Sequence, residues 1–182
     1  MEIPANNVKK VLLTEDEIKN RVKELGKQIT NDYKDCSNLL VIGILKGSFI
    51  FFSDLIREID LPIEIDFMAV SSYQDATISN GEVKIIKDVG TNVVKKNILF
   101  VEDIIDTGFT MMKVMEMFEE RGANSVKLCA LTSKPDRRKV RVNIDYLGFE
   151  IPDEFIIGYG LDYAEKYRNL KYIGILKEET YM

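Results

Sequence analysis

The densest set of side chains able to bind an anion lies in the segment VEDIIDTGFT, residues 101–110. Thr107, Gly108 and Thr110 stand directly before a predicted helix. Backbone N–H groups at a helix N-terminus point outward, and the helix dipole favours negative charge there. Gly108 lets the backbone approach a ligand closely, and the two threonine hydroxyls are additional donors. This pattern is typical of a site for a terminal phosphate.

Two carboxylates, Glu102 and Asp103, open the same segment. Carboxylates accept hydrogen bonds from vicinal hydroxyls and hold Mg²⁺ directly or through water, so the pair indicates a sugar that carries the phosphate. Asp106 lies between the acid pair and the phosphate loop, where it can reach a reacting centre. Each residue alone has an ordinary explanation, as a helix cap or a solvated strand end, but their coincidence favours a ligand site. The sequence contains no Walker A loop, and no GxGxxG follows a predicted strand.

The chain of 182 residues contains no histidine. This excludes Ser-His-Asp and Cys-His nucleophile systems and HExxH zinc sites, and it leaves proton transfer to Asp, Glu, Lys and Tyr. The formal net charge of −5 does not favour nucleic-acid binding. Five basic residues lie within Lys134–Arg141, but such a run is usually a solvated face, and it lacks interleaved aromatic residues.

Apolar segments must supply the elements that position these residues. The runs at Leu39–Leu45, Asn97–Val101 and Val126–Leu131 predict strands buried on both faces. Further strands are predicted at Ile63–Val70, Val83–Val89, Ile144–Phe149, Phe155–Gly158 and Ile173–Leu176. Helices are predicted over 14–34, with a Thr14–Glu17 capping box, over 48–59, and from about 110 to a stop at Gly122. The polar stretch Ser71–Glu82 predicts a long mobile loop.

This alternation predicts an α/β fold with a mostly parallel sheet flanked by helices. Ligands of such sheets bind beyond the carboxyl ends of the strands, which points to Lys46-Gly47, to residues 102–110 and to Lys134 onward. Length and composition fit a single domain over 1–182, with 46% hydrophobic and 30% charged residues. No apolar run approaches a membrane span, and residues 1–10 lack the apolar core of a signal peptide. Cys36 and Cys129 form no disulfide framework, so we expect a cytoplasmic protein without a membrane partner.

The motifs together resemble the type I phosphoribosyltransferases. VEDIIDTGFT resembles their motif for phosphoribosyl pyrophosphate (PRPP), and LKGS at 45–48 resembles the pyrophosphate loop of their hypoxanthine-guanine branch. SSY at 71–73, LTSKPDRR and GFEIPDEFIIGYGLDY are similar to further segments of that branch in its short bacterial form. The resemblance runs from about Leu12 to Leu176. It implies transfer of a phosphoribosyl group from PRPP to hypoxanthine or guanine, with Mg²⁺, by a homodimer or homotetramer. It also implies a core of about 37–140 and a small hood made by about 1–36 and 141–182.

The resemblance implies a role for each matching residue. Ribose hydroxyls and Mg²⁺ are assigned to Glu102 and Asp103, and a second Mg²⁺ to Asp162. The 5′-phosphate is assigned to Asp106, Thr107, Gly108, Phe109 and Thr110, with Phe109 acting through its backbone. Asp106 also handles a proton near purine N7 and is the expected catalytic residue. Pyrophosphate is assigned to Leu45, Lys46, Gly47 and Arg168, with a cis peptide between Leu45 and Lys46. The purine is assigned to Lys134 at O6, to Phe155 by stacking, to the Ile156 backbone and to Asp162. Ser72 and Tyr73 belong to the mobile loop that closes over the reacting centre.

Three other functions stay open from the sequence. The first is a PRPP-sensing regulator of the same fold that binds nucleic acid through residues 134–141. The second is a transferase for another base, such as xanthine or a pyrimidine. The third is a signalling domain phosphorylated on Asp103 or Asp106, which explains neither the phosphate loop nor the two C-terminal motifs.

Overall fold

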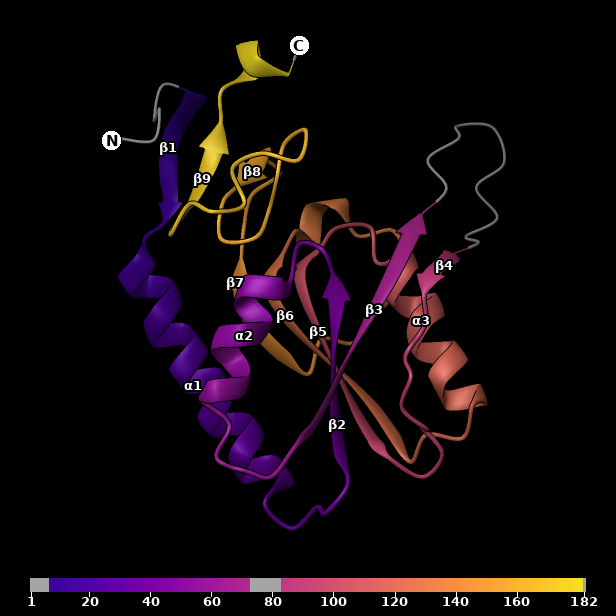
Figure 1. The fold of residues 1–182 in the computed structure, drawn as a ribbon. Coiled ribbons are helices and arrows are strands. Elements are labelled where there is room, and N and C mark those ends of the chain that lie inside the picture. Colours follow the sequence, from indigo (N-terminus) through magenta and orange to yellow (C-terminus); the bar gives the residue numbers. More distant parts are fainter. Residues whose placement is uncertain (1–6, 73–82, 182) are drawn as a thin grey trace.

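The computed structural model describes residues 7–72 and 83–181. Its centre is a six-stranded sheet in the order β4-β3-β2-β5-β6-β7 (Figure 1). The strands are β2 (Leu39–Leu45), β3 (Glu64–Ser72), β4 (Val83–Lys87), β5 (Asn97–Ile105), β6 (Ser125–Ser133) and β7 (Tyr146–Glu150). All neighbours are parallel except β4, which is antiparallel to β3. The predicted mostly parallel sheet is confirmed.

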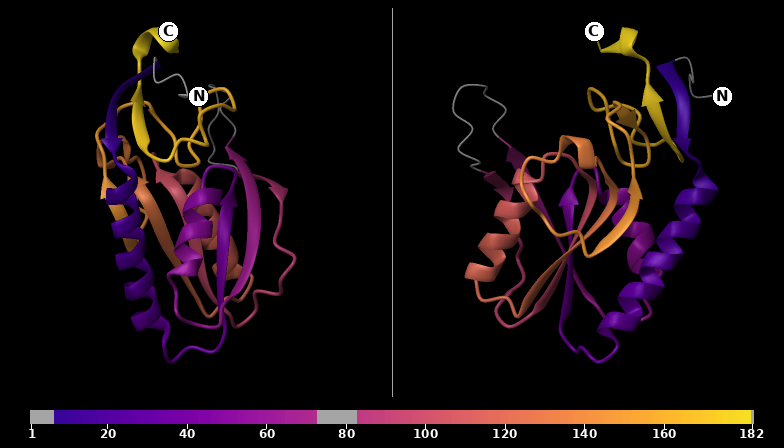
Figure 2. Two further views of the ribbon diagram at one scale, coloured as in Figure 1. Left: turned by 60° about the vertical axis from the view of Figure 1, so that its left-hand side comes forward. Right: turned by 180° about the vertical axis from the view of Figure 1, so that it is seen from behind.

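Helices cover both faces of this sheet, as its buried strands require. Helices α1 (Glu15–Tyr33) and α2 (Phe49–Arg57) pack on one face and α3 (Phe109–Glu120) packs on the other (Figures 1 and 2). Alternate residues of β2 divide between the two cores: Val41 faces α1 and α2, whereas Leu40 and Ile42 belong to the core under α3.

The first helix begins where the sequence predicts it. The Thr14 side chain accepts from the backbone N–H of Glu17, and the Glu17 side chain accepts from the backbone N–H of Thr14, which confirms the capping box. Ile18, Val22 and Ile29 then lie on its buried face. No helix in the described part of the chain is long and apolar enough to cross a membrane.

A second, smaller sheet is built from segments near the two ends of the chain. Its order is β1 (Val8–Leu13), β9 (Ile173–Leu176), β8 (Ile156–Ile157), with antiparallel neighbours. It lies above the end of the large sheet to which the arrowheads of β2 and β3 point (Figures 1 and 2). The expected small hood of the fold is therefore present, although β1 itself was not predicted as a strand. The pattern VKKVLL lacks clear alternation, and pairing with β9 makes it a strand.

Several strand boundaries differ from the prediction, and two of them, in β5 and β8, bear on the site. Residues Glu102 and Asp103 were expected to follow β5, but the strand continues through them to Ile105, because Ile104 and Ile105 still pair with Thr132 and Ser133 of β6. The strand predicted at 155–158 contains only two residues. Both boundaries were set by pairing with a distant strand, which hydrophobic runs do not reveal.

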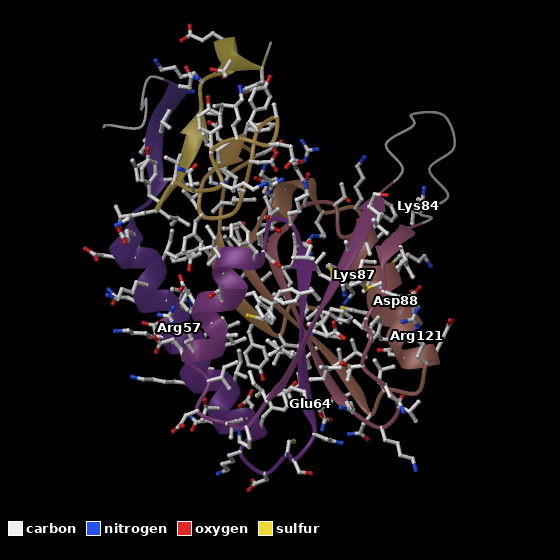
Figure 3. The ribbon with its side chains drawn as sticks, in the orientation of Figure 1. Arg57, Glu64, Lys84, Lys87, Asp88 and Arg121 are labelled. Carbon is white, nitrogen blue, oxygen red and sulfur yellow. The ribbon has the colours of Figure 1, made fainter. Side chains whose placement is uncertain are left out.

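The antiparallel edge strand is tied to the helix behind it. The Arg121 guanidinium, just after α3, donates to both carboxylate oxygens of Asp88, just after β4, at 2.8 and 2.7 Å (Figure 3). This hydrogen bonding lowers the pKa of Asp88 below its ordinary value. A bidentate pair of this kind fixes orientation as well as distance, so it holds the β4 end against α3.

Candidate active site

The residues predicted to bind phosphate and ribose converge with Leu45 and Gly47 at the carboxyl ends of β2 and β5. A cavity of about 230 Å³ opens there. It is lined by Leu45, Gly47, Glu102, Asp103, Asp106, Thr107, Gly108 and Thr110, together with apolar neighbours. A larger cavity of about 330 Å³ lies between α1, α2 and residues 169–171, but it contains none of the predicted site residues. The chemistry therefore points to the smaller cavity.

The phosphate loop is held from behind by the basic segment that follows β6. Gly108 is the N-cap of α3 with φ 91°, a left-handed conformation that disfavours a side chain. A Cβ there would come within 3.1 Å of Arg138. The carbonyl of Thr107 accepts from the backbone N–H of Lys139 at 3.0 Å, and Arg138 Nε donates to the Asp106 carbonyl at 3.1 Å. Part of the basic run thus supports the loop and is not merely a solvated face.

The carboxylate groups of the acid pair are enclosed, and burial is the largest influence on both of their pKa values. Asp103 is 8% exposed, and burial raises its pKa to about 6. Burial, and then the charge of Asp103, raise the pKa of Glu102 well above its ordinary value. Glu102 is only partly buried as a residue, yet its Oε2 is enclosed and has no hydrogen-bond partner among the described residues. Unsatisfied buried carboxylates require a cation or donors from a ligand.

This arrangement fits Mg²⁺ held jointly with a substrate. In the described part of the chain, no three side chains of metal-binding type form a complete metal site. Mg²⁺ usually binds one or two carboxylates and takes its other ligands from water and substrate phosphates. Two adjacent carboxylates, one with an unpaired enclosed oxygen, match that requirement.

Replacing Asp103 with Asn is expected to stabilise the ligand-free protein at about pH 8 by ~1–3 kcal/mol. The folded-state pKa of about 6 lies above the ordinary value of 3.8, so the folded state binds the proton more tightly and stability falls as pH rises from about 4 to about 6. The benefit of Asn should be present above this window and lost below it. Urea unfolding of both proteins at about pH 4 and pH 8 measures the difference. An equal gain at both pH values would contradict the charge explanation.

Asp106 forms an ion pair that the sequence did not reveal. Arg137 Nε donates to Asp106 Oδ1 at 2.7 Å, and Arg137 also lies 3.5 Å from Asp153 Oδ1. The same Asp153 oxygen is 3.4 Å from Lys134 Nζ, whose residue is only 8% exposed. The expected catalytic carboxylate and the expected purine-binding lysine are therefore linked through Arg137 and Asp153. Only the three-dimensional fold brings residue 137 to residue 106.

The loop Leu45–Gly47, which we expect to bind pyrophosphate, lies against Asp103 and against the 158–172 segment, which joins β8 to β9. The peptide between Leu45 and Lys46 is cis, as the resemblance implies. A Cβ on Gly47 would meet Asp103 Oδ2 at 1.8 Å, and a Cβ on Gly160 would meet the Gly47 carbonyl oxygen at 2.0 Å. Two glycines thus allow three backbone segments to meet at this point.

The side chains of Lys46 and Arg168, two residues expected at the pyrophosphate site, both contact acidic side chains. Lys46 Nζ lies 3.0 Å from Glu165, and the guanidinium of Arg168 lies 2.8 Å from Asp162 and 3.3 Å from Glu165. Arg168 also donates to the Gly160 carbonyl at 2.9 Å. Glu165 and Gly160 belong to this group but were not among the predicted site residues, although Gly160 lies within the motif at 148–163.

The small sheet and the segments beside it supply the aromatic residue predicted for base stacking. Phe155 is 37% exposed and lies directly before β8. Its ring is stacked on that of Tyr181, with centroids 5.1 Å apart and planes at 25°, and Tyr163 meets it edge-on at 5.6 Å. Ile156 is buried and pairs with Ile175 of β9. Tyr181 was missed because it lies far along the chain from the recognised motif.

Two of the predicted residues, Ser72 and Tyr73, lie where the described part of the chain ends. Ser72 is the last residue of β3. Tyr73 and the rest of the expected mobile loop to residue 82 fall outside the described residues.

Comparison with known proteins gives a consistent set of relatives. The model of the family described as "Phosphoribosyl transferase domain" matches residues 10–164. A hypoxanthine-guanine phosphoribosyltransferase from Streptococcus mutans is 53% identical over 96% of this chain and 97% of the relative. The protein of the same name from Bacillus subtilis is 52% identical over 97% of both chains. The crystal structure of a hypoxanthine phosphoribosyltransferase from Staphylococcus aureus has a TM-score of 0.93 at 52% identity, covering 97% of this chain and 96% of that one.

Proposed function

The chain belongs to the phosphoribosyltransferase family, and from this premise we propose that it transfers the 5-phosphoribosyl group of PRPP to N9 of hypoxanthine or guanine. The products are IMP or GMP and pyrophosphate, so the protein is an enzyme of purine salvage. One observation supports placing this chemistry at the described cavity. The enclosed oxygen of Glu102, which has no hydrogen-bond partner within residues 7–72 and 83–181, adjoins a loop at a helix N-terminus, so a place for sugar hydroxyls lies beside a place for phosphate.

We assign the PRPP contacts to the two loops that line the cavity. Asp106–Thr110 surrounds the 5′-phosphate with backbone N–H groups at the start of α3. Glu102 and Asp103 accept from the ribose hydroxyls and hold Mg²⁺, for which Asp162 is a further candidate ligand. Mg²⁺ supplies positive charge to the departing pyrophosphate. Leu45–Gly47 and Arg168 receive the same group from the protein side.

The base is assigned to the wall formed by the end of β6 and the start of β8. Lys134 donates to purine O6, Phe155 stacks on the ring, and the backbone of Ile156 contacts its edge. Asp162 approaches the exocyclic group. Asp106 handles the proton at N7. The anomeric carbon becomes oxocarbenium-like as pyrophosphate leaves, so the site acts mainly by electrostatic stabilisation and positioning.

Initial rates with PRPP and four bases test the function directly. Hypoxanthine and guanine should be turned over with release of pyrophosphate, and adenine should be a very poor substrate; xanthine reports how much the 2-position matters. Binding of PRPP without turnover of any base would instead indicate the regulator considered above. A preference for a pyrimidine would indicate the transferase for another base.

Lys134→Gln should lower kcat/KM for hypoxanthine by ~10- to 100-fold, because a hydrogen bond to a charged group is worth ~1.5–3 kcal/mol. The amide of the introduced glutamine can present either a donor or an acceptor. The difference in kcat/KM between hypoxanthine and adenine should therefore become smaller. Phe155→Ala should weaken the binding of both bases by the same ~1–3 kcal/mol, because stacking does not depend on the 6-substituent. The comparison is kcat/KM for both bases in both variants. If Lys134→Gln lowers both by the same factor, Lys134 does not determine specificity.

The family resemblance also includes assembly and location. We propose a homodimer or homotetramer; large apolar side chains of Ile65, Ile86 and Val94 remain 48%, 66% and 51% exposed in the single chain. Sedimentation equilibrium measures the assembly. A cytoplasmic location is supported by two free cysteines, Cys36 and Cys129.

A further inference from the structure

A tight turn in the 158–172 segment presents Glu165 in a conformation that its residue type disfavours. Tyr163 and Lys166 exchange backbone hydrogen bonds at 3.2 and 3.0 Å, and the two residues between them, Ala164 and Glu165, have φ values of 50° and 61°. Positive φ at both central positions is the signature of a type I′ turn, which favours Asn-Gly. An Ala-Glu pair costs free energy there. Such strain is retained where a side chain has a function.

The Glu165 carboxylate bridges two cations from distant parts of the chain. Its Oε2 lies 3.0 Å from Lys46 Nζ and 3.3 Å from the Arg168 guanidinium. Hydrogen bonds from Lys46 and then Arg168 hold the pKa of Glu165 below its ordinary value, so it is charged at neutral pH. One anionic oxygen between these two cations is the contact that a phosphate oxygen would make.

We propose that Glu165 is a built-in competitor for the pyrophosphate group of PRPP. In the ligand-free enzyme its carboxylate occupies Lys46 and Arg168, and substrate must displace it. The inference rests on the proposed function, because that function assigns the Leu45–Gly47 loop and Arg168 to pyrophosphate, and it adds the Lys46 ammonium to that site. Glu165 therefore weakens PRPP binding and, after transfer, competes with pyrophosphate for the same cations and favours its release.

The contacts identify Glu165 as the partner that gives way. The side chains of Lys46 and Glu165 are 67% and 66% exposed, and exposed ion pairs are weak and easily exchanged. Arg168 is different: its side chain is 19% exposed and stays anchored by Asp162 at 2.8 Å and by the Gly160 carbonyl at 2.9 Å. The turn also keeps its shape without the carboxylate, since the backbone N–H of Glu165 donates to Asp162 at 2.9 Å. Displacement of the Glu165 side chain thus frees Lys46 and Arg168 while Arg168 stays in position.

The test compares Glu165→Gln with wild type and with Glu120→Gln. Glu120 is exposed at the far end of α3, so its variant removes the same unit of charge at a distance from the site. We expect Glu165→Gln to lower the Kd of magnesium pyrophosphate, measured by calorimetry, and the KM of PRPP by ~3- to 10-fold, in line with the loss of two exposed ion pairs. The KM of hypoxanthine should change less than twofold. Product inhibition by pyrophosphate should become stronger, and the gain should shrink at high salt.

Unchanged or weaker pyrophosphate binding by Glu165→Gln would overturn the inference and leave the proposed function intact. An equal gain in Glu120→Gln would also overturn it, because the effect would then come from net charge alone. Absence of phosphoribosyl transfer by the wild type would overturn the proposed function. In that case calorimetry with pyrophosphate still tests the contact between Glu165 and the two cations.

Discussion

Replacing Asp106 with Asn should lower kcat by ~10²–10⁴, the usual range for loss of an acid or base group. The chain has no histidine, and Asp106 lines the cavity between the acid pair and the phosphate loop. Asn keeps the size of the side chain but cannot exchange a proton in the same way. Single-turnover rates should show the loss in the chemical step, with PRPP binding retained. Near-wild-type turnover would remove Asp106 from this role.

Arg137→Gln is the matched control for that substitution. Asp106→Asn also breaks the ion pair with Arg137, and Arg137→Gln breaks the same pair while it leaves the carboxylate in place. The pair is about half exposed on both sides, so its loss should cost only ~0.2–1 kcal/mol. We therefore expect Arg137→Gln to keep most of the activity. If it loses as much as Asp106→Asn, the orientation of Asp106 by Arg137 is the larger effect.

Gly47→Ala should lower kcat/KM by ~10²-fold, because a catalytic group displaced by about 1 Å loses that much. The added Cβ would stand 1.8 Å from Asp103 Oδ2, so the buried carboxylate must move. Gly47 does not have a positive φ, and thus the effect comes from space alone. Asp103 is the proposed ligand of ribose and Mg²⁺, so the KM of PRPP should rise and the Mg²⁺ requirement should increase.

Gly90→Ala provides the comparison. Gly90 likewise lacks a positive φ, but its added Cβ would meet only Asp66 Oδ2, at 4.0 Å, an ordinary contact. This variant should retain wild-type kinetics. Wild-type activity in Gly47→Ala would show that Asp103 can shift without loss, and it would contradict the close packing of the two loops as a catalytic requirement.

The parts of this site that could be predicted from the sequence are those formed by residues close together in the chain. The phosphate loop, the acid pair and the buried strand β2 each combine residue types within ten positions, so periodicity and motif reveal them. The roles assigned to the purine wall came from resemblance, because Phe155 alone reads as a core residue.

The remaining contacts depend on tertiary structure. Glu165 meets Lys46 across 119 positions, and Arg137 meets Asp106 across 31. The residues around a cation in the sequence do not determine which distant surface carboxylate it will contact. The same reason explains the missed strand β1, whose polar face gives no signal until β9 pairs with it. Ion pairs and edge strands are set by the assembled fold, whereas buried strands are set by their own composition.

Because β1 pairs with β9, the two halves of the site, one for sugar and phosphate and one for the base, are completed at different times during synthesis. The residues of the phosphate loop, the acid pair and the pyrophosphate loop have all been synthesised by the end of β6 at Ser133, and the supporting contacts from Arg138 and Lys139 follow within six residues. The wall against which a base would stack needs Phe155 and the pairing of β8 with β9, and β9 in turn pairs with residues 8–13, which were made early. A nascent or C-terminally clipped chain would thus hold the sugar-phosphate half of the site without the base half. Residues 8–13 have no β9 partner until residues 173–176 have been made, so the hood sheet and the nucleobase wall form together at the end of synthesis.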